Sequence, residues 1–249
     1  MATIVPTDCR GETVPNRLPI ECMTKCPMRG LLARGGKAGG VAGPSAAIQT
    51  VAMRDGEQLY RAGEPTSGVF CVHSGLVKLV ARAGDGEERA GRIVRIVQPA
   101  GVLGLESLFL SSFQCTAVAV NDVVACRISI ADLKAMLDAV PRTRMRLLRY
   151  CYGELTRLEA WLADFADHSA TSRVRIARLL LHMREGRTDR LHCLRHQDMA
   201  SILGVAMETI CRNLSRMTGD GLISEYRAAA SSGYYRADIR RLEHLAHGG

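Results

Sequence analysis

The sequence predicts an α+β protein that consists of an N-terminal antiparallel β-barrel of jelly-roll type, one long helix and a C-terminal winged helix-turn-helix. Short β-type runs separated by glycine turns occupy residues 49–138, and a long stretch with helical periodicity follows. Two short helical segments on either side of a glycine come near the C-terminus. Short alternating runs bounded by glycine are typical of strands, and a repeat of apolar residues every three to four positions is typical of helices. We therefore expect four segments, at residues 1–48, 49–138, 139–168 and 169–249.

Composition points to a globular protein with a polyanionic partner. The chain has 249 residues, of which 47% are hydrophobic, and a formal net charge of +8. Much of the basic excess falls in residues 169–249, which suits nucleic acid, although a solvated basic surface has the same composition. The sequence contains no run of 18 or more apolar residues and no secretory signal, so we expect no membrane contact and a cytoplasmic location.

The first segment, residues 1–48, carries Cys9, Cys22 and Cys26 and ends in a glycine-rich stretch. Such a stretch is typical of a flexible linker. Nine cysteines in a reducing compartment indicate small core residues or a metal or redox site rather than a disulfide scaffold.

The second segment contains short β-type runs at regular spacing. Residues 69–72 and 76–80 flank the turn at Ser74 and Gly75, and further runs cover residues 92–97, 117–120 and 123–130. Several short strands at this spacing predict an antiparallel barrel or sandwich.

The third segment is a helix that starts after Pro141 and continues to about Asp167. Apolar residues and one cysteine recur along it with a seven-residue period at two offsets. These positions are Leu148, Leu155 and Leu162, and Cys151, Leu158 and Phe165. This pattern is typical of a helix that pairs with its own copy, so we expect a homodimer interface at these six residues. The alternative is a helix packed only on its own domain.

The fourth segment contains a helix-turn-helix, with helices predicted at residues 197–203 and 207–217 around Gly204. Gly219, Gly221 and Gly233 predict the turns of a wing. On the second helix, Glu208 and Arg212 share one face, and Arg and Glu are suited to bonding guanine and cytosine edges in the major groove. A surface ion pair between them is the alternative. We expect the DNA contacts to come from Glu208, Thr209, Cys211, Arg212 and Arg216.

Taken in this order, the elements of residues 50–246 resemble the CRP/FNR family of transcription regulators. The FNR branch reads DNA with Glu, two intervening residues and Ser-Arg, and residues 208–212 are similar, with Cys211 in place of Ser. The resemblance implies a β domain of the cyclic-nucleotide-binding type and a homodimer on a palindromic double-stranded operator. It also implies RNA polymerase as a partner and no enzymatic activity.

The same resemblance implies a sensor. The oxygen-sensing FNR branch binds a [4Fe–4S] cluster through N-terminal cysteines and one cysteine of the β domain. The matching residues here are Cys9, Cys22, Cys26 and Cys126, although Cys22 and Cys26 have the spacing C-x3-C in place of the branch's C-x2-C. Cys115, expected in a loop, is a reserve ligand. An intact cluster is expected to set the pairing of the long helices and so the separation of the two DNA-reading helices.

Other sensor chemistries remain open. One is a cofactor-free, FixK-like regulator controlled by abundance or by thiol oxidation, for which Cys211 is the redox-sensitive candidate. Others are haem, suggested by residues 70–75, and zinc bound by the N-terminal cysteines. Cyclic AMP is not expected, because residues 96–126 contain no Arg or Lys to bind a phosphate, and Glu106 fits the FNR version of this loop. Cys71, Cys151 and Cys193 are expected to be small core residues.

Overall fold

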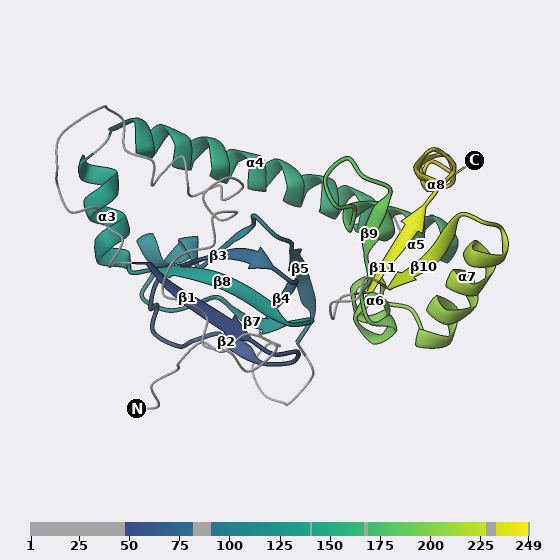
Figure 1. Cartoon of the computed structure of the whole chain (residues 1–249), viewed down its shortest axis with the longest axis horizontal. Helices are drawn as coiled ribbons and strands as arrows, with labels where there is room; N and C mark the ends of the chain where they lie inside the picture. The colour runs from purple at the N-terminus through teal and green to yellow at the C-terminus, as the bar shows by residue number, and fades with distance from the viewer. Residues whose placement is uncertain (1–47, 82–90, 140, 167–168, 228–232, 249) are drawn as a thin grey trace. The chain divides into compact units, whose positions relative to one another are not determined.

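The computed structural model describes residues 48–81, 91–139, 141–166, 169–227 and 233–248 (Figure 1). The predicted N-terminal segment with Cys9, Cys22 and Cys26 therefore lies outside the described residues. The chain forms two compact units that divide inside a long helix, between Tyr152 and Gly153. The four segment boundaries given above remain predictions.

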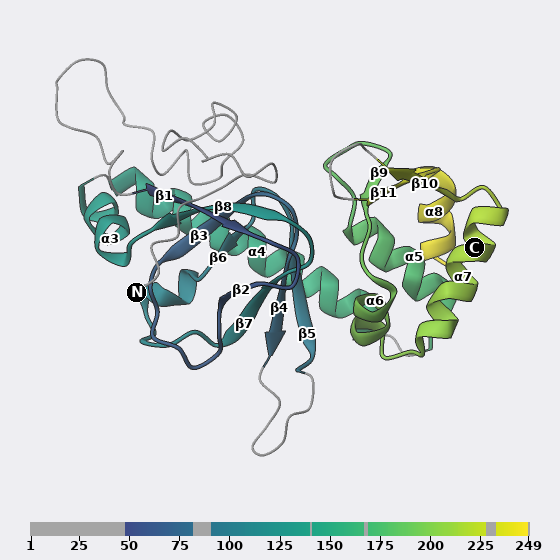
Figure 2. The same ribbon diagram turned by 60° about the horizontal axis from the view of Figure 1, so that its bottom comes forward.

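The N-terminal unit is built from two four-stranded antiparallel sheets (Figures 1 and 2). In the first sheet the order is β1 (Ile48–Met53), β8 (Val123–Ile128), β3 (Val69–Ser74) and β6 (Val102–Leu103). In the second it is β2 (Gln58–Tyr60), β7 (Cys115–Ala119), β4 (Val77–Ala81) and β5 (Ile93–Val97). The jelly-roll arrangement is confirmed. The closed barrel is not, because among the described residues no ladder of hydrogen bonds joins one sheet to the other.

The main core of this unit is formed by residues that alternate along the strands, as in a sheet with one buried face. Phe113 is 2% exposed, and its ring stacks on that of Tyr60 with 3.8 Å between the ring centroids. Phe70 and Leu103 belong to the same cluster. Burial raises the pKa of Tyr60, because a buried phenolate would lose its hydration.

A second cluster covers the other face of the first sheet. Val69 and Ile128 of the sheet belong to it together with Leu133 of α3 (Ile130–Ala139) and Leu147 of α4 (Pro141–Ala166). The short helix η2 (Leu105–Leu108) adds partly buried leucines. The hydroxyl of Tyr150 accepts a hydrogen bond of 2.8 Å from the backbone N–H of Val102, which ties the first half of α4 to β6.

The C-terminal unit is a winged helix, as predicted. It contains α5 (Ser172–His182), β9 (Arg190–His192), α6 (His196–Leu203), α7 (Met207–Gly219), β10 (Ile223–Arg227), β11 (Gly233–Ala237) and α8 (Ile239–Ala246). The three strands form one antiparallel sheet in the order β10-β11-β9. Thr171 and Asp238 cap the N-termini of α5 and α8 through their side-chain oxygens.

None of the helices formed by the described residues is both long enough and apolar enough to cross a membrane.

Candidate DNA-binding surface

The turn between α6 and α7 depends on Gly204. This residue ends α6 with φ 63° and ψ 37°, a left-handed conformation that favours glycine. An added Cβ would meet no atom within 4 Å, so backbone conformation rather than space explains the glycine. The buried Arg175 donates a hydrogen bond of 2.6 Å to the carbonyl oxygen of Leu203 and satisfies one carbonyl at the end of α6. These interactions fix the direction in which α7 leaves the turn.

The apolar side of α7 holds it against the rest of the unit. Ile210, Leu214 and Met217 are at most 5% exposed and recur at helical spacing. Ile202 and Leu203 of α6 are buried as well. The opposite side of α7 is therefore the side that faces outward.

That outward side carries the charged residues that the sequence predicted. Glu208, Arg212 and Arg216 are exposed, while Thr209 and Cys211 are partly exposed at its margins. Within the described part of the chain, the side chains of Glu208, Arg212 and Arg216 make no ion pair, so the alternative of a Glu208–Arg212 surface pair is not what this structure contains. Two guanidinium groups and a carboxylate are thus available to an external partner.

Sequence reasoning missed the residue that contacts Cys211. The Sγ atom of Cys211 lies 3.2 Å from Nδ1 of His196, the first residue of α6. The sequence separates the two by 15 residues, and only the crossing of α6 and α7 brings them together. The spacing of the two helices could have indicated contact between them but not which side chains meet.

One cation–π contact lies within the small sheet of β9, β10 and β11. The guanidinium of Arg190 stacks over the ring of Tyr234 with 4.6 Å from Cζ to the ring centroid. Cys193 lies between β9 and α6, where burial and the neighbouring carboxylate of Glu225 raise the pKa of its thiol to about 12. Its thiol is therefore neutral at physiological pH, but Cys193 is only partly buried and is not the core residue that the sequence predicted.

Comparison with known proteins agrees with this architecture. Residues 50–139 match the cyclic nucleotide-binding domain family, and residues 174–245 match the Crp-like helix-turn-helix domain family. The chain is 26% identical to the transcriptional activator protein Anr of Pseudomonas aeruginosa over 178 residues, which are 69% of this chain and 71% of that protein. It is 28% identical to the CRP-like cAMP-activated global transcriptional regulator of Mycobacterium tuberculosis over 71% of this chain and 80% of that protein.

The fold is similar to that of FixK2 from Bradyrhizobium japonicum, with a TM-score of 0.66 and 23% identity over 80% of this chain and 96% of that one. The chain belongs to the CRP/FNR family of transcription regulators. Within it, the chain belongs to the FNR/FixK-like branch and is a DNA-binding transcription regulator.

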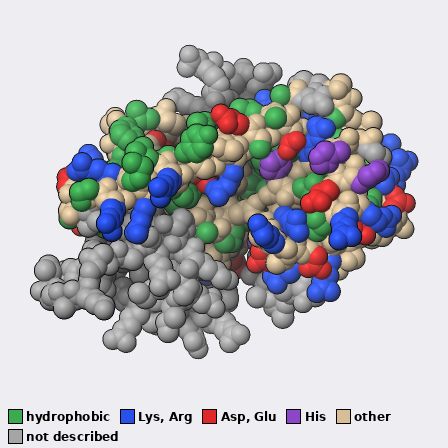
Figure 3. Space-filling model, turned by 90° about the horizontal axis from the view of Figure 1, so that it is seen from above, with side chains coloured by type: hydrophobic (Ala, Val, Ile, Leu, Met, Phe, Trp, Pro, Cys, Tyr) green, Lys and Arg blue, Asp and Glu red, His purple; other side chains and the backbone are tan. Residues whose placement is uncertain are grey.

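In this CRP/FNR protein, α4 carries a stripe of apolar side chains that are at least half exposed. Leu148, Leu155 and Leu162 are 61%, 50% and 65% exposed. Met145 and Tyr152, which the sequence analysis did not include, are 54% and 72% exposed and continue the stripe. Figure 3, which looks onto α4, shows hydrophobic side chains there beside a row of basic ones.

The other three predicted interface residues differ from these leucines in their exposure. Cys151 is exposed, so the expectation that it is a small core residue is wrong, and Leu158 is half-buried. Phe165 is 7% exposed and instead packs within its own unit, 4.7 Å from the ring of Trp161 and 5.6 Å from that of His182 between centroids. Phe165 is thus covered by its own chain.

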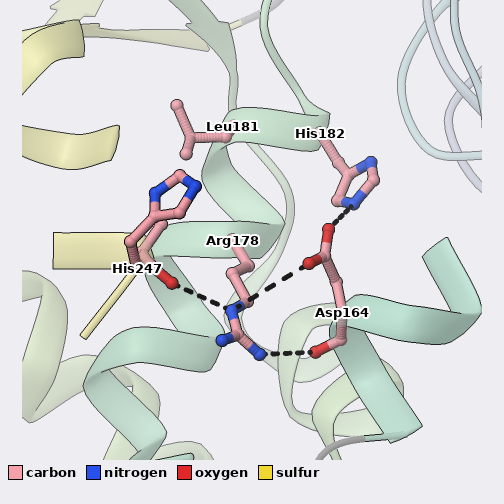
Figure 4. A pocket seen from close by; sticks show the side chains of 6 residues that line it. Asp164, Arg178, Leu181, His182 and His247 are labelled. Carbon is pink, nitrogen blue, oxygen red and sulfur yellow. Dashed lines mark hydrogen bonds and ion pairs between the residues drawn. The ribbon is translucent and has the colours of Figure 1, made fainter. Parts of the chain in front are cut away.

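The last turn of α4 is fixed to the C-terminal unit at a pocket of about 330 Å³ (Figure 4). Asp164 approaches His182 of α5, with 2.6 Å between Oδ2 and Nε2. Arg178 donates hydrogen bonds to the carbonyl oxygens of Ala246 and Asp164. The pocket is lined largely by groups that already bond one another, so it acts as a structural joint between α4, α5 and α8.

The described cysteines of the β domain lie in two different sheets. Cys126 of β8 is 4% exposed. Cys115, expected in a loop, is instead the first residue of β7 in the other sheet. Burial and the nearby Glu106 carboxylate raise the pKa of the Cys115 thiol, which disfavours the thiolate that a metal requires. The described residues contain no group of three or more His, Cys, Asp or Glu placed to hold a metal ion.

Proposed function

We propose that this regulator binds a palindromic operator as a homodimer and reads each half-site with α7 in the major groove. The observation that carries this proposal is the outward face of α7, where Glu208, Arg212 and Arg216 lack ion-pair partners among the described residues. Arg212 would bond the O6 and N7 atoms of a guanine, and Glu208 would accept a hydrogen bond from a cytosine amino group. Thr209 and Cys211 would contact the margins of the same site.

The test is Arg212→Ala with Arg240→Ala as the matched control. Both residues are exposed arginines of the C-terminal unit, but Arg240 lies on α8. Loss of a bidentate base contact should weaken operator binding by about 1–3 kcal/mol per half-site and relax the base preference at one position. Arg240→Ala should weaken only the salt-dependent, non-specific binding of DNA. Equal effects of the two variants on sequence preference would contradict the assignment of α7.

Dimerisation along α4 is the second part of the proposal. Its support is the exposed stripe of Leu148, Leu155 and Leu162, with Cys151 and Leu158 at its edge and Met145 and Tyr152 as additions. A row of exposed apolar residues with this spacing is typical of a surface that a second protein surface covers. RNA polymerase is the further partner that a regulator of this family would contact, and we assign the chain no enzymatic activity.

We further propose that a [4Fe–4S] cluster is the sensor, with Cys9, Cys22, Cys26 and Cys126 as the ligands expected from the family. Among the described residues, Cys126 of β8 can supply a soft sulfur donor, which would bind iron as the thiolate. When bound, such a cluster supplies a group that oxygen or nitric oxide degrades. The chain's own part is to hold the N-terminal cysteines against β8, whose sheet packs on the first half of α4.

The experiment for this sensor is the iron and acid-labile sulfide content of protein purified without oxygen. About four of each per chain, lost in air, would support the cluster. Iron-free protein that still binds a palindromic site would contradict it and leave the DNA-binding proposal intact.

The 3.2 Å contact between His196 and Cys211 favours a second candidate, a cofactor-free regulator controlled by thiol oxidation. The imidazole lies within hydrogen-bonding distance of the thiol, and a cysteine thiolate is the form that attacks peroxide. Oxidation to a sulfenic acid would place a larger polar group at the margin of the DNA-reading face. Cys211→Ser should then keep operator binding and make it insensitive to peroxide, whereas continued sensitivity would contradict this candidate.

Activation by cyclic AMP is not part of the proposal. The stretch that would line a nucleotide site contains no Arg or Lys between Ile96 and Cys126, and a buried phosphate without a cation is poorly stabilised. Phe113, which belongs to this stretch, stacks on Tyr60 in the core of the β domain. Calorimetric titration with cyclic AMP should show no saturable heat.

A further inference from the structure

Helix α5 bonds to the ends of both helices of the helix-turn-helix. At the end of α6, Arg175 donates its hydrogen bond to the carbonyl oxygen of Leu203. At the end of α7, Nη2 of Arg173 lies 2.5 Å from Oδ2 of Asp220. One turn of α5 therefore holds both the turn that precedes α7 and the end at which α7 stops.

Asp220 is bonded to a third helix as well. It is the C-cap residue of α7, and its backbone N–H donates a hydrogen bond of 2.9 Å to the carbonyl oxygen of Arg216. Its own carbonyl oxygen accepts a hydrogen bond of 3.1 Å from Arg241 of α8. The end of α7 is thus attached to α5 through a side chain and to α8 through the backbone. These attachments lie one helical turn from an arginine of the proposed DNA-reading face.

The charges of Arg173 and Asp220 do not suit their own helices. Arg173 lies in the first turn of α5, where the helix dipole disfavours a cation, and Asp220 follows the last turn of α7, where the dipole disfavours an anion. Each charge is instead compensated by the other. Both side chains remain partly exposed, at 32% and 50%, so the pair adds little to the stability of the unit. The pair therefore matters more for where α7 ends than for whether the unit folds.

A small change in the angle of α7 would become a large displacement at the DNA. The helix has 13 residues and is about 20 Å long, so a tilt of about 10° about one end moves the other end by about 3 Å. A hydrogen bond to a base edge tolerates a change of only a few tenths of an ångström. The arginines of the outward face can therefore reach their bases only if both ends of α7 are held.

We propose that Arg173 and Asp220 are positioning residues, whose ion pair sets the angle of α7 and through it the sequence preference of the regulator. The inference rests on the proposed role of α7 as the DNA-reading helix and adds to it the contact that aligns that helix. Loss of the pair should lower discrimination between DNA sequences more than it lowers non-specific binding. The reason is that base contacts carry the sequence information, whereas phosphate contacts carry the non-specific affinity.

The test reverses the two charges one at a time and then together, in the full chain. The variants are Arg173→Glu, Asp220→Arg and the double variant, which restores the ion pair. Each is titrated, at one salt concentration, with a palindromic duplex that the unmodified chain selects from random DNA and with an unrelated duplex of the same length. We expect each single reversal to lower the ratio of the two affinities by about tenfold, as one mismatched base pair does. The double variant should recover most of that loss.

The matched control is the ion pair between Arg184 and Glu243, which joins the segment after α5 to α8 and has a similar exposure, at 28% and 49%. Reversing either of its charges should leave the affinity ratio unchanged. Thermal unfolding checks that all variants fold, and the two sets should change the unfolding midpoint by similar amounts. Asp220→Asn removes the charge without repulsion, replaces a reversed variant that does not fold, and should lower the ratio by a smaller factor.

An unchanged ratio in the single variants, or a double variant no better than the worse of the two, would overturn the positioning role. Arg212→Ala, measured on the same two duplexes, separates this result from a failure of the proposed function. If Arg212→Ala lowers the ratio while the charge reversals do not, only the positioning role fails. If Arg212→Ala leaves the ratio unchanged as well, the proposed role of α7 fails with it.

Discussion

Helices α4 and α7 are both amphipathic, but they leave opposite kinds of surface uncovered. On α4 the exposed stripe is apolar, with Leu148, Leu155 and Leu162 at least half exposed. On α7 the exposed side carries Glu208, Arg212 and Arg216. An apolar stripe needs a protein surface to cover it, whereas a charged face with two arginines suits a polyanion. The same periodicity thus specifies two kinds of partner, and the residue types on the exposed side decide between them.

The largest effect is expected when a negative charge is introduced into the exposed apolar stripe of α4. Leu155→Glu would place a carboxylate opposite its own copy in the proposed dimer, and the chain should become monomeric. Operator binding should then fall by about 10²- to 10⁴-fold, because the second half-site no longer benefits from a high effective concentration. Sedimentation and operator titration measure both effects. Thr156→Glu, one position away on the same helix, is the control and should remain dimeric.

A core substitution in the β domain should affect stability without changing either exposed stripe. Phe113 is 2% exposed and stacks on Tyr60. Phe113→Ala should lower the free energy of unfolding by about 3–5 kcal/mol through lost burial and the cavity left behind. Urea denaturation measures this loss. The variant should keep its operator sequence preference while folded, and a changed preference would contradict the separation of the two roles.

The angle at which α7 leaves its turn can be tested at Gly204. Gly204→Ala should cost about 1–2 kcal/mol of stability, because alanine is strained at φ 63° although there is room for its Cβ. Gly204→Asn should cost less, since asparagine tolerates this conformation better. Thermal unfolding compares the two variants. Equal costs would point to a steric cause in place of the backbone conformation.

The smallest effect concerns the two cysteines of the C-terminal unit. Burial and Glu225 raise the pKa of Cys193 to about 12, so its thiol stays protonated when folded and ionises nearer 9 when unfolded. Its contribution to stability is therefore complete below pH 9 and declines as the pH rises toward 12. Cys193→Ala should make unfolding less sensitive to alkaline pH. At pH 8, iodoacetamide should label the partly exposed Cys211 before Cys193.

Much of the outward face of α7, which we propose reads DNA, could be predicted because its information is local. The four-residue spacing of Glu208 and Arg212 fixes their shared face once the segment is helical, and the buried Ile210 and Leu214 fix the opposite one. The contact between His196 and Cys211 was not predictable in the same way, because it depends on how α6 crosses α7.

The β domain shows the limit of sequence reasoning. The strands were recognisable, but the pairing of Cys71 with Cys126 depends on the register of β3 and β8, and a slip of one residue would separate the two thiols onto different faces. The seven-residue pattern predicts Phe165 in the dimer seam, because the residue continues that pattern. Its packing on Trp161 and His182 is a tertiary contact that no periodicity reveals.

In the dimer that we propose, the joint at Asp164 would make the helical phase of α4 a determinant of the spacing between the two DNA-reading helices. Because Asp164 bonds His182 and Arg178, the turn of α4 that carries Leu162 is fixed to the same unit that carries α7. Each residue of an α-helix turns the chain by about 100°, so loss of Ala163 would rotate that unit by this angle about the helix axis relative to Leu155. A dimer with an unchanged seam would then present its two recognition helices to different sides of the duplex.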